Sequence, residues 1–309
     1  MRLNCFSRFF CLTNTVNYDK MKCTDISLPF EILDHGVFME LLLSTGTFIG
    51  RINDRNFDLL PEHKSDFKCD GFEFMIFPGF YPKLDEITEK YLAAKINIPV
   101  MHFDKDIGDG IGSESSDEYA NALKKLEINL DTANALGTKK AVIHLWGRTD
   151  SDKNSDIIYK RAGEVKDICL QKGVLPVFEN IFCCVSSPLY HLENLASIYP
   201  DMRFIIDSRP AQFHGELEKT LKSPIMQRVK HLHINDYAGG YKEWAKVNPI
   251  PQPQKGVIDW KMYFDGIKNA GYDGTVTLEA PAHLPVGVDS ETLNASLDFI
   301  RKNMFENGE

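Results

Sequence analysis

Four short apolar runs in the second half of the chain each end on a side chain that can bind a metal ion. The runs span 175–179, 203–207, 229–233 and 275–279, and their last residues are Glu179, Asp207, His233 and Glu279. Mostly apolar runs of this length are typical of strands buried on both faces. Because the carboxyl ends of neighbouring parallel strands meet at one rim, we expect three carboxylates and one imidazole to converge there.

Any one of these side chains has an ordinary explanation, since a carboxylate at a strand end can cap a helix and a strand histidine can be a satisfied core residue. Four of them on consecutive strands are harder to explain in that way, because clustered carboxylates without a cation repel each other. We therefore predict that Glu179, Asp207, His233 and Glu279 bind one divalent ion, Mn²⁺, Mg²⁺, Co²⁺ or Zn²⁺.

Such an ion can act as a Lewis acid on a substrate carbonyl and so acidify the neighbouring C–H bond. Glu179 and Glu279, each with one oxygen free of the ion, are the candidate proton carriers on opposite faces of a planar enediolate. Return of the proton to the same carbon gives epimerisation. Return to the adjacent carbon gives aldose–ketose isomerisation.

The elements that must position these residues alternate between strand and helix from residue 39 onward. Further strands are predicted at 41–45, 73–77, 98–103 and 140–145, and helices at 85–95, 117–136, 156–172, 188–198, 215–221, 258–270 and 290–304. Eight such units in about 270 residues favour a (β/α)8 barrel, with the active site at the carboxyl rim of its strands. An open doubly wound sheet is the alternative, but no Gly-x-Gly-x-x-Gly follows the first strand.

Composition narrows the class of protein. The chain has 309 residues, 43% of them hydrophobic, and a net charge of -9, which allows a large core and argues against a nucleic-acid surface. No apolar stretch is long enough to span a membrane. The seven cysteines lack zinc-finger spacing, so we expect reduced thiols and a cytoplasmic protein.

Residues 1–38 differ from the rest in having scattered cysteines and phenylalanines without a clear period. Two interpretations stay open. Met39 is the natural first residue, or the segment is a genuine, loosely ordered extension. In both, the barrel occupies residues 39–309.

Several stretches resemble the xylose isomerase-like barrels, the superfamily of sugar and sugar-phosphate isomerases and epimerases and of the family 2 AP endonucleases. They are 177–180, 205–207, 231–236, 255–260 and 271–274, the last leading to Glu279, within a resemblance over about 40–305. The resemblance implies the barrel fold and the same four metal ligands.

Two departures from the family pattern disfavour the endonuclease reaction. Pro210 stands where members often carry a histidine, and the stretch 248–256 lacks the Asp-x-His pair of the endonucleases. A phosphodiesterase site with three metal ions would therefore lack several ligands. With the acidic net charge, this argues against nucleic acid as a partner.

Other residues near the predicted rim are candidates for substrate binding. His102 and His144 end the third and fourth strands and are expected to donate hydrogen bonds to substrate hydroxyls, with a backbone-bonded core histidine as the alternative. Trp146 is a candidate apolar wall or ordinary packing. Arg209 is a candidate clamp for a carboxylate or phosphate, or the partner of a local acid, and Lys255 is a second anion contact.

Two further acids have open roles. Glu73 is expected either to point into the barrel near the site or to pair with Arg51, and Asp236 is a candidate for orienting the metal ligands. The long connections 104–117 and 235–259 are predicted to overhang the rim as loops, either as lids or as solvated insertions.

The favoured function is a metal-dependent isomerase or epimerase of a sugar, sugar phosphate or related ketone. One alternative is a dehydratase of an inositol-derived ketone, in which His102 or His144 protonates the leaving hydroxyl. A non-catalytic sugar-binding barrel and an AP endonuclease-like enzyme are the others. The expected partner is a small carbohydrate, with no nucleic acid and no membrane, and a homo-oligomer is compatible with this interpretation.

Overall fold

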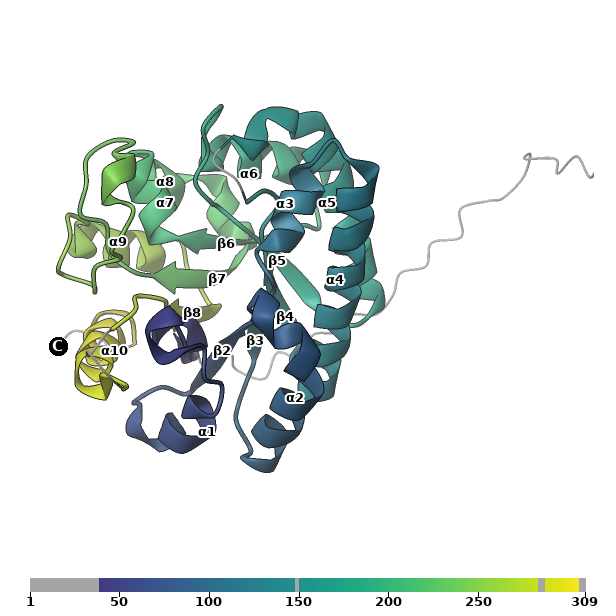
Figure 1. Ribbon diagram of the computed structural model, residues 1–309. Helices are drawn as coiled ribbons and strands as arrows, with labels where there is room; N and C mark the ends of the chain where they lie inside the picture. Colours follow the sequence, from purple (N-terminus) through teal and green to yellow (C-terminus); the bar gives the residue numbers. More distant parts are fainter. Residues whose placement is uncertain (1–38, 148–149, 283–286, 306–309) are drawn as a thin grey trace, which may run out of the picture. The chain divides into compact units, whose positions relative to one another are not determined.

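The computed structural model describes residues 39–147, 150–282 and 287–305. Eight parallel strands close into a barrel in which each pairs with the next along the chain and the last pairs with the first, with helices around them (Figure 1). The strands are β1 Leu41–Ser44, β2 Gly71–Met75, β3 Val100–His102, β4 Lys140–Ile143, β5 Leu175–Glu179, β6 Arg203–Asp207, β7 Val229–Ile234 and β8 Thr275–Leu278. The predicted (β/α)8 barrel is confirmed.

Helices lie in the connections between the strands and cover the outside of the barrel (Figure 1). They are α1 Leu59–His63, α2 Leu84–Ala93, α3 Asp106–Gly112, α4 Ser116–Leu136, α5 Ser155–Gln171, α6 Pro188–Ile198, α7 Ser208–Phe213, α8 Leu217–Lys222, α9 Trp260–Asn269 and α10 Ser290–Met304. No helix in the described parts of the chain combines the length and apolar character needed to cross a membrane.

The long helix α4 shows how local sequence sets an element. Its N-cap Ser115 accepts a hydrogen bond from the Glu118 amide, and the helix ends at Gly137, which adopts a left-handed conformation with φ 77°. Leu126 and Leu130 lie one turn apart on its buried face. The amphipathic spacing and the closing glycine thus produce the helix predicted at 117–136.

The connection 104–117 contains the helix α3, where the sequence predicted a glycine-rich loop. A Cβ at Gly108 would lie 2.7 Å from the Cβ of His144, and one at Gly110 would lie 2.5 Å from the Cβ of Ala122. These glycines therefore serve close packing of α3 on the barrel and on α4. Strand β2 also differs from the prediction, because it begins two residues earlier, at Gly71.

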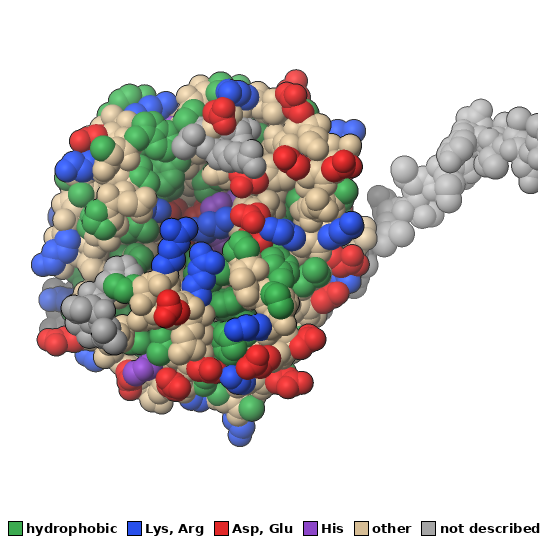
Figure 2. All heavy atoms as spheres, viewed as in Figure 1, with side chains coloured by type: hydrophobic (Ala, Val, Ile, Leu, Met, Phe, Trp, Pro, Cys, Tyr) green, Lys and Arg blue, Asp and Glu red, His purple; other side chains and the backbone are tan. Residues whose placement is uncertain are grey.

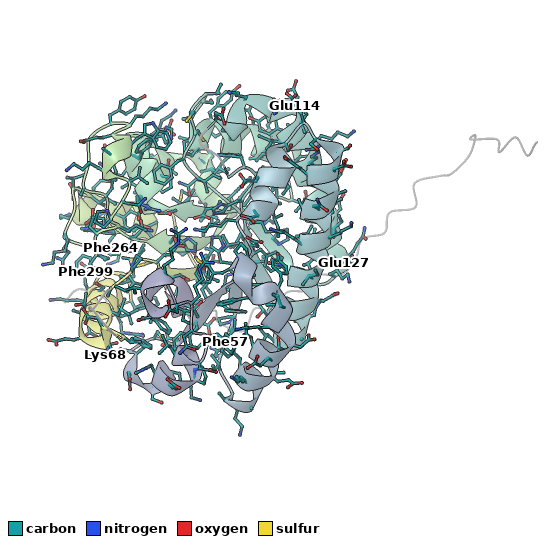
Figure 3. All side chains as sticks on the ribbon, in the orientation of Figure 1. Phe57, Lys68, Glu114, Glu127, Phe264 and Phe299 are labelled. Carbon is teal, nitrogen blue, oxygen red and sulfur yellow. The ribbon has the colours of Figure 1, made fainter. Side chains whose placement is uncertain are left out.

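The core has two parts, separated by the barrel wall. Outward-facing strand residues pack against the helices in one large apolar cluster, which includes Phe264 and Phe299 of α9 and α10, whose ring centroids lie 5.6 Å apart (Figure 3). A smaller cluster lies inside the barrel and consists of Leu42, Val100, Val142, Val177 and Ile205. It draws on β1 and β3 to β6, so β2, β7 and β8 contribute none of its members.

Candidate metal centre and substrate pocket

Four side chains converge at the carboxyl ends of the last four strands. Glu179 and Asp207 end β5 and β6, His233 lies near the end of β7, and Glu279 follows β8. Their candidate ligand atoms all lie within 4.8 Å of one another, and all four residues are buried. Alternate residues of a strand face the same side, so register alone brings these side chains to the inside of the rim.

His233 lies at the centre of this group. Its Nδ1 is 3.1 Å from Glu179 Oε1 and 3.1 Å from Glu279 Oε2. Its Nε2 faces the opposite way, 3.0 and 3.1 Å from the two oxygens of Glu73. The imidazole therefore separates the carboxylates at the rim from a carboxylate in the barrel interior.

Burial and close charges shift the pKa values of the group in different directions. Burial opposes ionisation of all of them, but the negative charges of Glu73, Glu279 and Glu179 hold the pKa of His233 well above its usual range. Positive charge on His233 outweighs burial at Glu279 and lowers its pKa to about 2. Burial, aided by the charges of Glu279 and Glu179, raises the pKa of Asp207 to about 7 despite Arg209.

A divalent cation fits this donor set. Three carboxylates and one imidazole supply the oxygen and nitrogen ligands that such ions prefer. Burial, together with the charges of Glu279 and Glu179, opposes ionisation of Asp207, and a cation would offset this cost. Among the described residues, Glu179 Oε2 is also buried without an aligned hydrogen-bond partner. Glu179, Asp207, His233 and Glu279 are the residues that would hold the ion.

Two histidines face the second oxygen of Glu179. His144 Nε2 lies 2.6 Å and His102 Nε2 lies 3.4 Å from Glu179 Oε2. His102 Nδ1 donates a hydrogen bond to the Phe103 carbonyl at 2.8 Å, which turns Nε2 towards Glu179. Burial outweighs the nearby negative charge and lowers the pKa of His144 to about 4. His102 is fully buried and is not among the described lining residues of the pocket, so its contact with a substrate hydroxyl stays a prediction.

A cavity of about 370 Å³ opens onto the centre, a volume suited to a small molecule. Glu179, Asp207, Glu279 and His144 line it, together with Lys105, Gly147, Ile181, Phe182, Arg209, Pro210, Trp244, Val247 and Asn248. Figure 2 shows Lys and Arg side chains close to acidic and histidine side chains near the middle of the face in view. The pocket therefore combines acids, bases and apolar walls.

Arg209 and Lys105 bring positive charge to this pocket. Arg209 donates from Nη1 to the Val247 carbonyl at 3.0 Å, and its guanidinium lies 5.2 Å from the Phe182 ring centroid. Among the described residues, its buried Nε has no hydrogen-bond partner. Lys105 Nζ is 3.9 Å from Glu279 Oε1, and its side chain is half exposed.

The aromatic residues at the pocket do not include Trp146, for which both a wall and ordinary packing were predicted as alternatives. Phe182 and Trp244 are the aromatic residues among its described lining, with ring centroids 5.9 Å apart. Trp146 is only 1% exposed and donates from Nε1 to the Phe182 carbonyl at 3.0 Å. Trp146 thus supports the wall from behind. Lys255 is exposed in the connection between β7 and α9 and is not among the described lining residues.

Asp236 holds the connection that follows β7. Its carboxylate accepts hydrogen bonds from the Trp260 indole at 2.9 Å and from the backbone amides of Tyr237 and Ile258. Glu73 points into the barrel, as one of its two predicted alternatives requires, whereas Arg51 is exposed. Glu73, therefore, is the acid that contacts a predicted metal ligand.

Sequence reasoning missed Lys105, Phe182 and Trp244. Lys105 and Phe182 each come three residues after a predicted rim residue, His102 and Glu179. That position directly after a strand end was the available signal, because loops at the carboxyl face of a barrel build its active site. Nothing in the sequence alone distinguished Trp244 from Trp146.

Another buried group of possible ligands lies behind the pocket, at Asp152, Cys183 and His191. Asp152 accepts hydrogen bonds from the backbone amides of Cys184, Val185 and Ser186, and lies 3.2 Å from His191 Nε2. Its lone pairs are thus engaged in holding the connection after β5. His191 thus helps to hold this connection in place.

Residues 64–303 match the family model described as the xylose isomerase-like TIM barrel. This chain belongs to that family. The match covers every strand except β1 and contains all four candidate ligands, so the predicted resemblance is confirmed.

Solved structures of this xylose isomerase-like fold are similar over most of the chain. The zinc-bound IolI protein has a TM-score of 0.68 at 15% identity, covering 87% of this chain and 100% of its own. D-allulose 3-epimerase from Methylomonas sp., in complex with D-allulose, has a TM-score of 0.68 at 12% identity, covering 86% and 97%.

A third similar structure is 3-keto-D-glucoside 4-epimerase (YcjR) from E. coli, with a TM-score of 0.63 at 16% identity, covering 86% of this chain and 100% of its own. No curated protein matches the sequence. At sequence identities of 12% to 16%, these similarities show that this protein has the same fold as the three structures.

Proposed function

We propose that the protein is a divalent-metal-dependent isomerase or epimerase of a sugar, sugar phosphate or related ketone. The observation that carries this proposal is the convergence of Glu179, Asp207, His233 and Glu279 on one point, beside a pocket of small-molecule size. Similar structures include two sugar epimerases and a zinc-bound protein, which supports the same class of substrate and cofactor.

A cation held by the four ligands would supply Lewis-acid polarisation of a substrate carbonyl. The protein itself contributes two glutamates, and in each of them the two carboxylate oxygens face different partners. Glu179 directs Oε1 to His233 and Oε2 to His144, while Glu279 directs Oε2 to His233 and Oε1 towards Lys105. One oxygen of each is thus placed to carry a proton.

This arrangement of Glu179 and Glu279 allows proton transfer. One glutamate takes a proton from the carbon beside the carbonyl, the C–H electron pair forms the carbon–carbon double bond of the enediolate, and the carbonyl pair moves onto its oxygen. The other glutamate, or the same one, returns a proton to that carbon, and the carbonyl forms again. Return to the former carbonyl carbon also requires the hydroxyl proton to pass to the former carbonyl oxygen. Their low pKa values keep Glu179 and Glu279 ionised and able to accept a proton.

Substrate binding is assigned to the remaining pocket residues. His144 lines the pocket and faces substrate hydroxyls, and Phe182 and Trp244 pack against the apolar face of a sugar ring. His102 is fully buried behind this lining, so its predicted hydrogen bond to a substrate hydroxyl requires the pocket to rearrange. Arg209 and Lys105 bind a carboxylate, a phosphate or the developing enediolate charge. Lys255 remains a predicted anion contact that requires its connection to move.

The test is solvent-hydrogen exchange. The purified protein is freed of metal, reloaded with Mn²⁺, Mg²⁺ or Co²⁺, and incubated with a panel of sugars and sugar phosphates in heavy water. We expect one substrate to gain deuterium beside its carbonyl, as read by NMR, only with metal present. Bound sugar without exchange would contradict the proposal and favour a binding protein, and loss of a hydroxyl would favour a dehydratase.

A further inference from the structure

A continuous line of buried polar side chains runs through the barrel from the start of β4 to His233. Lys140 Nζ donates to Thr275 Oγ1 at 2.8 Å, and Thr275 Oγ1 lies 2.6 Å from His231 Nδ1. His231 Nε2 is 2.7 Å from Glu73 Oε2, and Glu73 in turn faces His233 Nε2. The line thus begins at the amino-terminal end of the strands and reaches the candidate metal centre.

The chemistry of its two ends sets the direction of every hydrogen bond. An ammonium group only donates, so Thr275 Oγ1 accepts from Lys140 and gives its own hydrogen to His231 Nδ1. His231 therefore carries its proton on Nε2 and donates to Glu73. The Thr277 hydroxyl donates to the same carboxylate at 2.8 Å.

A carboxylate surrounded by donors can only accept. Glu73 is fully buried, and the hydrogens of the His231 ring and the Thr277 hydroxyl are directed at its carboxylate. His233 Nε2 must then donate to Glu73, which leaves Nδ1 directed at Glu179 and Glu279. The hydrogen bond to Glu73 therefore sets the orientation of the His233 ring.

The residues of this polar line lie on β2, β7 and β8, apart from Lys140 at the start of β4. The interior cluster of Leu42, Val100, Val142, Val177 and Ile205, on β1 and β3 to β6, is apolar. Burying a charged carboxylate costs free energy unless each of its hydrogen-bond partners is in place, and Glu73 has three donors around it. Its location directly behind His233 gives it a function in the metal centre.

We propose that Glu73 is a positioning residue that holds His233 with Nδ1 facing the cation. Through their chain of hydrogen bonds, Lys140, Thr275 and His231 keep the Glu73 carboxylate in a state in which it only accepts hydrogen bonds. This inference rests on the proposed metal centre. A hydrogen-bonded carboxylate behind a ligating histidine selects its tautomer and increases its basicity, and losing such a partner typically weakens metal binding 10- to 100-fold. Glu73 itself need not contact substrate.

The test compares Glu73→Gln with the wild-type protein. The amide of the variant keeps one accepting oxygen, which can serve His231 and Thr277. Its NH2 group then replaces the oxygen that faces His233 Nε2, and two donors meet there, so the ring of His233 loses its partner. We expect Mn²⁺ affinity, measured by calorimetry, to fall roughly 10- to 100-fold. Thr277→Val is the matched control, because it removes one donor to Glu73 but leaves the contact between Glu73 and His233 Nε2 in place, and its affinity should stay within about threefold of wild type.

A second readout separates positioning from general loosening of the core. Histidine-selective ¹⁵N NMR of the Zn²⁺-loaded wild type should show His233 protonated on Nε2 and bound to the ion through Nδ1. That pattern should be lost in Glu73→Gln while metal-free unfolding stays cooperative. Metal bound through Nε2 in the wild type overturns the proposal even if the variant fails to fold.

The remaining outcomes are distinguishable. Wild-type affinity together with an unchanged His233 tautomer in Glu73→Gln overturns the positioning role and leaves the proposed function intact. A wild-type protein that binds no divalent ion overturns both. Reduced affinity with the tautomer change supports the positioning role.

Discussion

The carboxylate of Glu179 bridges two histidines, with Oε1 3.1 Å from His233 Nδ1 and Oε2 2.6 Å from His144 Nε2. Because its oxygens point in different directions, one can bind a cation while the other stays free of it. Glu279 has a similar arrangement, with one oxygen at His233 and the other towards Lys105. This pairing underlies the proton transfer proposed above.

Replacing either glutamate should remove proton transfer without unfolding the barrel. Glu179→Gln and Glu279→Gln keep the shape of the side chain but cannot accept the proton, so turnover should fall by about 10²- to 10⁴-fold. Deuterium incorporation from heavy water measures the loss, and circular dichroism checks the fold. Full turnover in one variant would show that the other glutamate carries both protons.

Metal binding should weaken as the pH falls. Burial and the charges of Glu279 and Glu179 raise the pKa of Asp207 to about 7, so below that pH a proton increasingly occupies an oxygen that the cation needs. Affinity for Mn²⁺ should therefore fall progressively from pH 8 to pH 6, as measured by calorimetry. Asp207→Asn should bind the ion weakly and with a flatter pH profile. An affinity that is constant over this range would refute the assignment of Asp207.

Lys140 should make the stability of the fold rise with pH. Burial lowers its pKa from 10.5 to about 8, so below pH 8 both folded and unfolded chains carry the charge and the fold bears a constant cost. Between about pH 8 and 10.5 the folded state loses this proton first, and the cost is relieved. The shift corresponds to at most roughly 3 kcal/mol in the free energy of unfolding.

Urea unfolding of the wild type and of Lys140→Met across that range isolates this effect, because every other titrating group is common to both proteins. The difference between their unfolding free energies should change by up to about 3 kcal/mol in favour of the wild type as the pH rises. Parallel curves would mean that Lys140 keeps an ordinary pKa in the folded protein.

Two tryptophans should respond differently to truncation. Trp244 lines the pocket and is 41% exposed, so Trp244→Ala should raise KM with little change in unfolding. Trp146 is buried beneath Phe182, so Trp146→Ala should destabilise the fold by about 3–5 kcal/mol. Steady-state kinetics and thermal unfolding of both variants provide the comparison. A larger KM effect from Trp146→Phe, which keeps most of the packing, would place the sugar elsewhere.

The barrel and the convergence of its rim residues were predictable because both depend on short-range pattern. Apolar runs marked the strands, and Glu179 and Asp207 stood at their ends, where a parallel barrel gathers side chains. The role of Glu73 was harder to predict, since it depends on β2 starting at Gly71 and on which face of the pleat points inward.

The other differences between the predictions and the structure depend on tertiary packing. Gly108 and Gly110 were expected to mark a loop, but they permit a helix to pack closely against its neighbours. The burial of one tryptophan and the exposure of another depend on how connections fold over the rim, which local sequence does not encode. The expectations for residues 1–38 lie outside the described residues.

Anomalous diffraction from crystals soaked in Mn²⁺ tests the metal centre most directly. We predict one strong peak at roughly 2.0–2.3 Å from an oxygen of each of Glu179, Asp207 and Glu279 and from Nδ1 of His233. Four side chains turned away from one another, with no peak between them, would contradict the metal centre and the chemistry assigned to it.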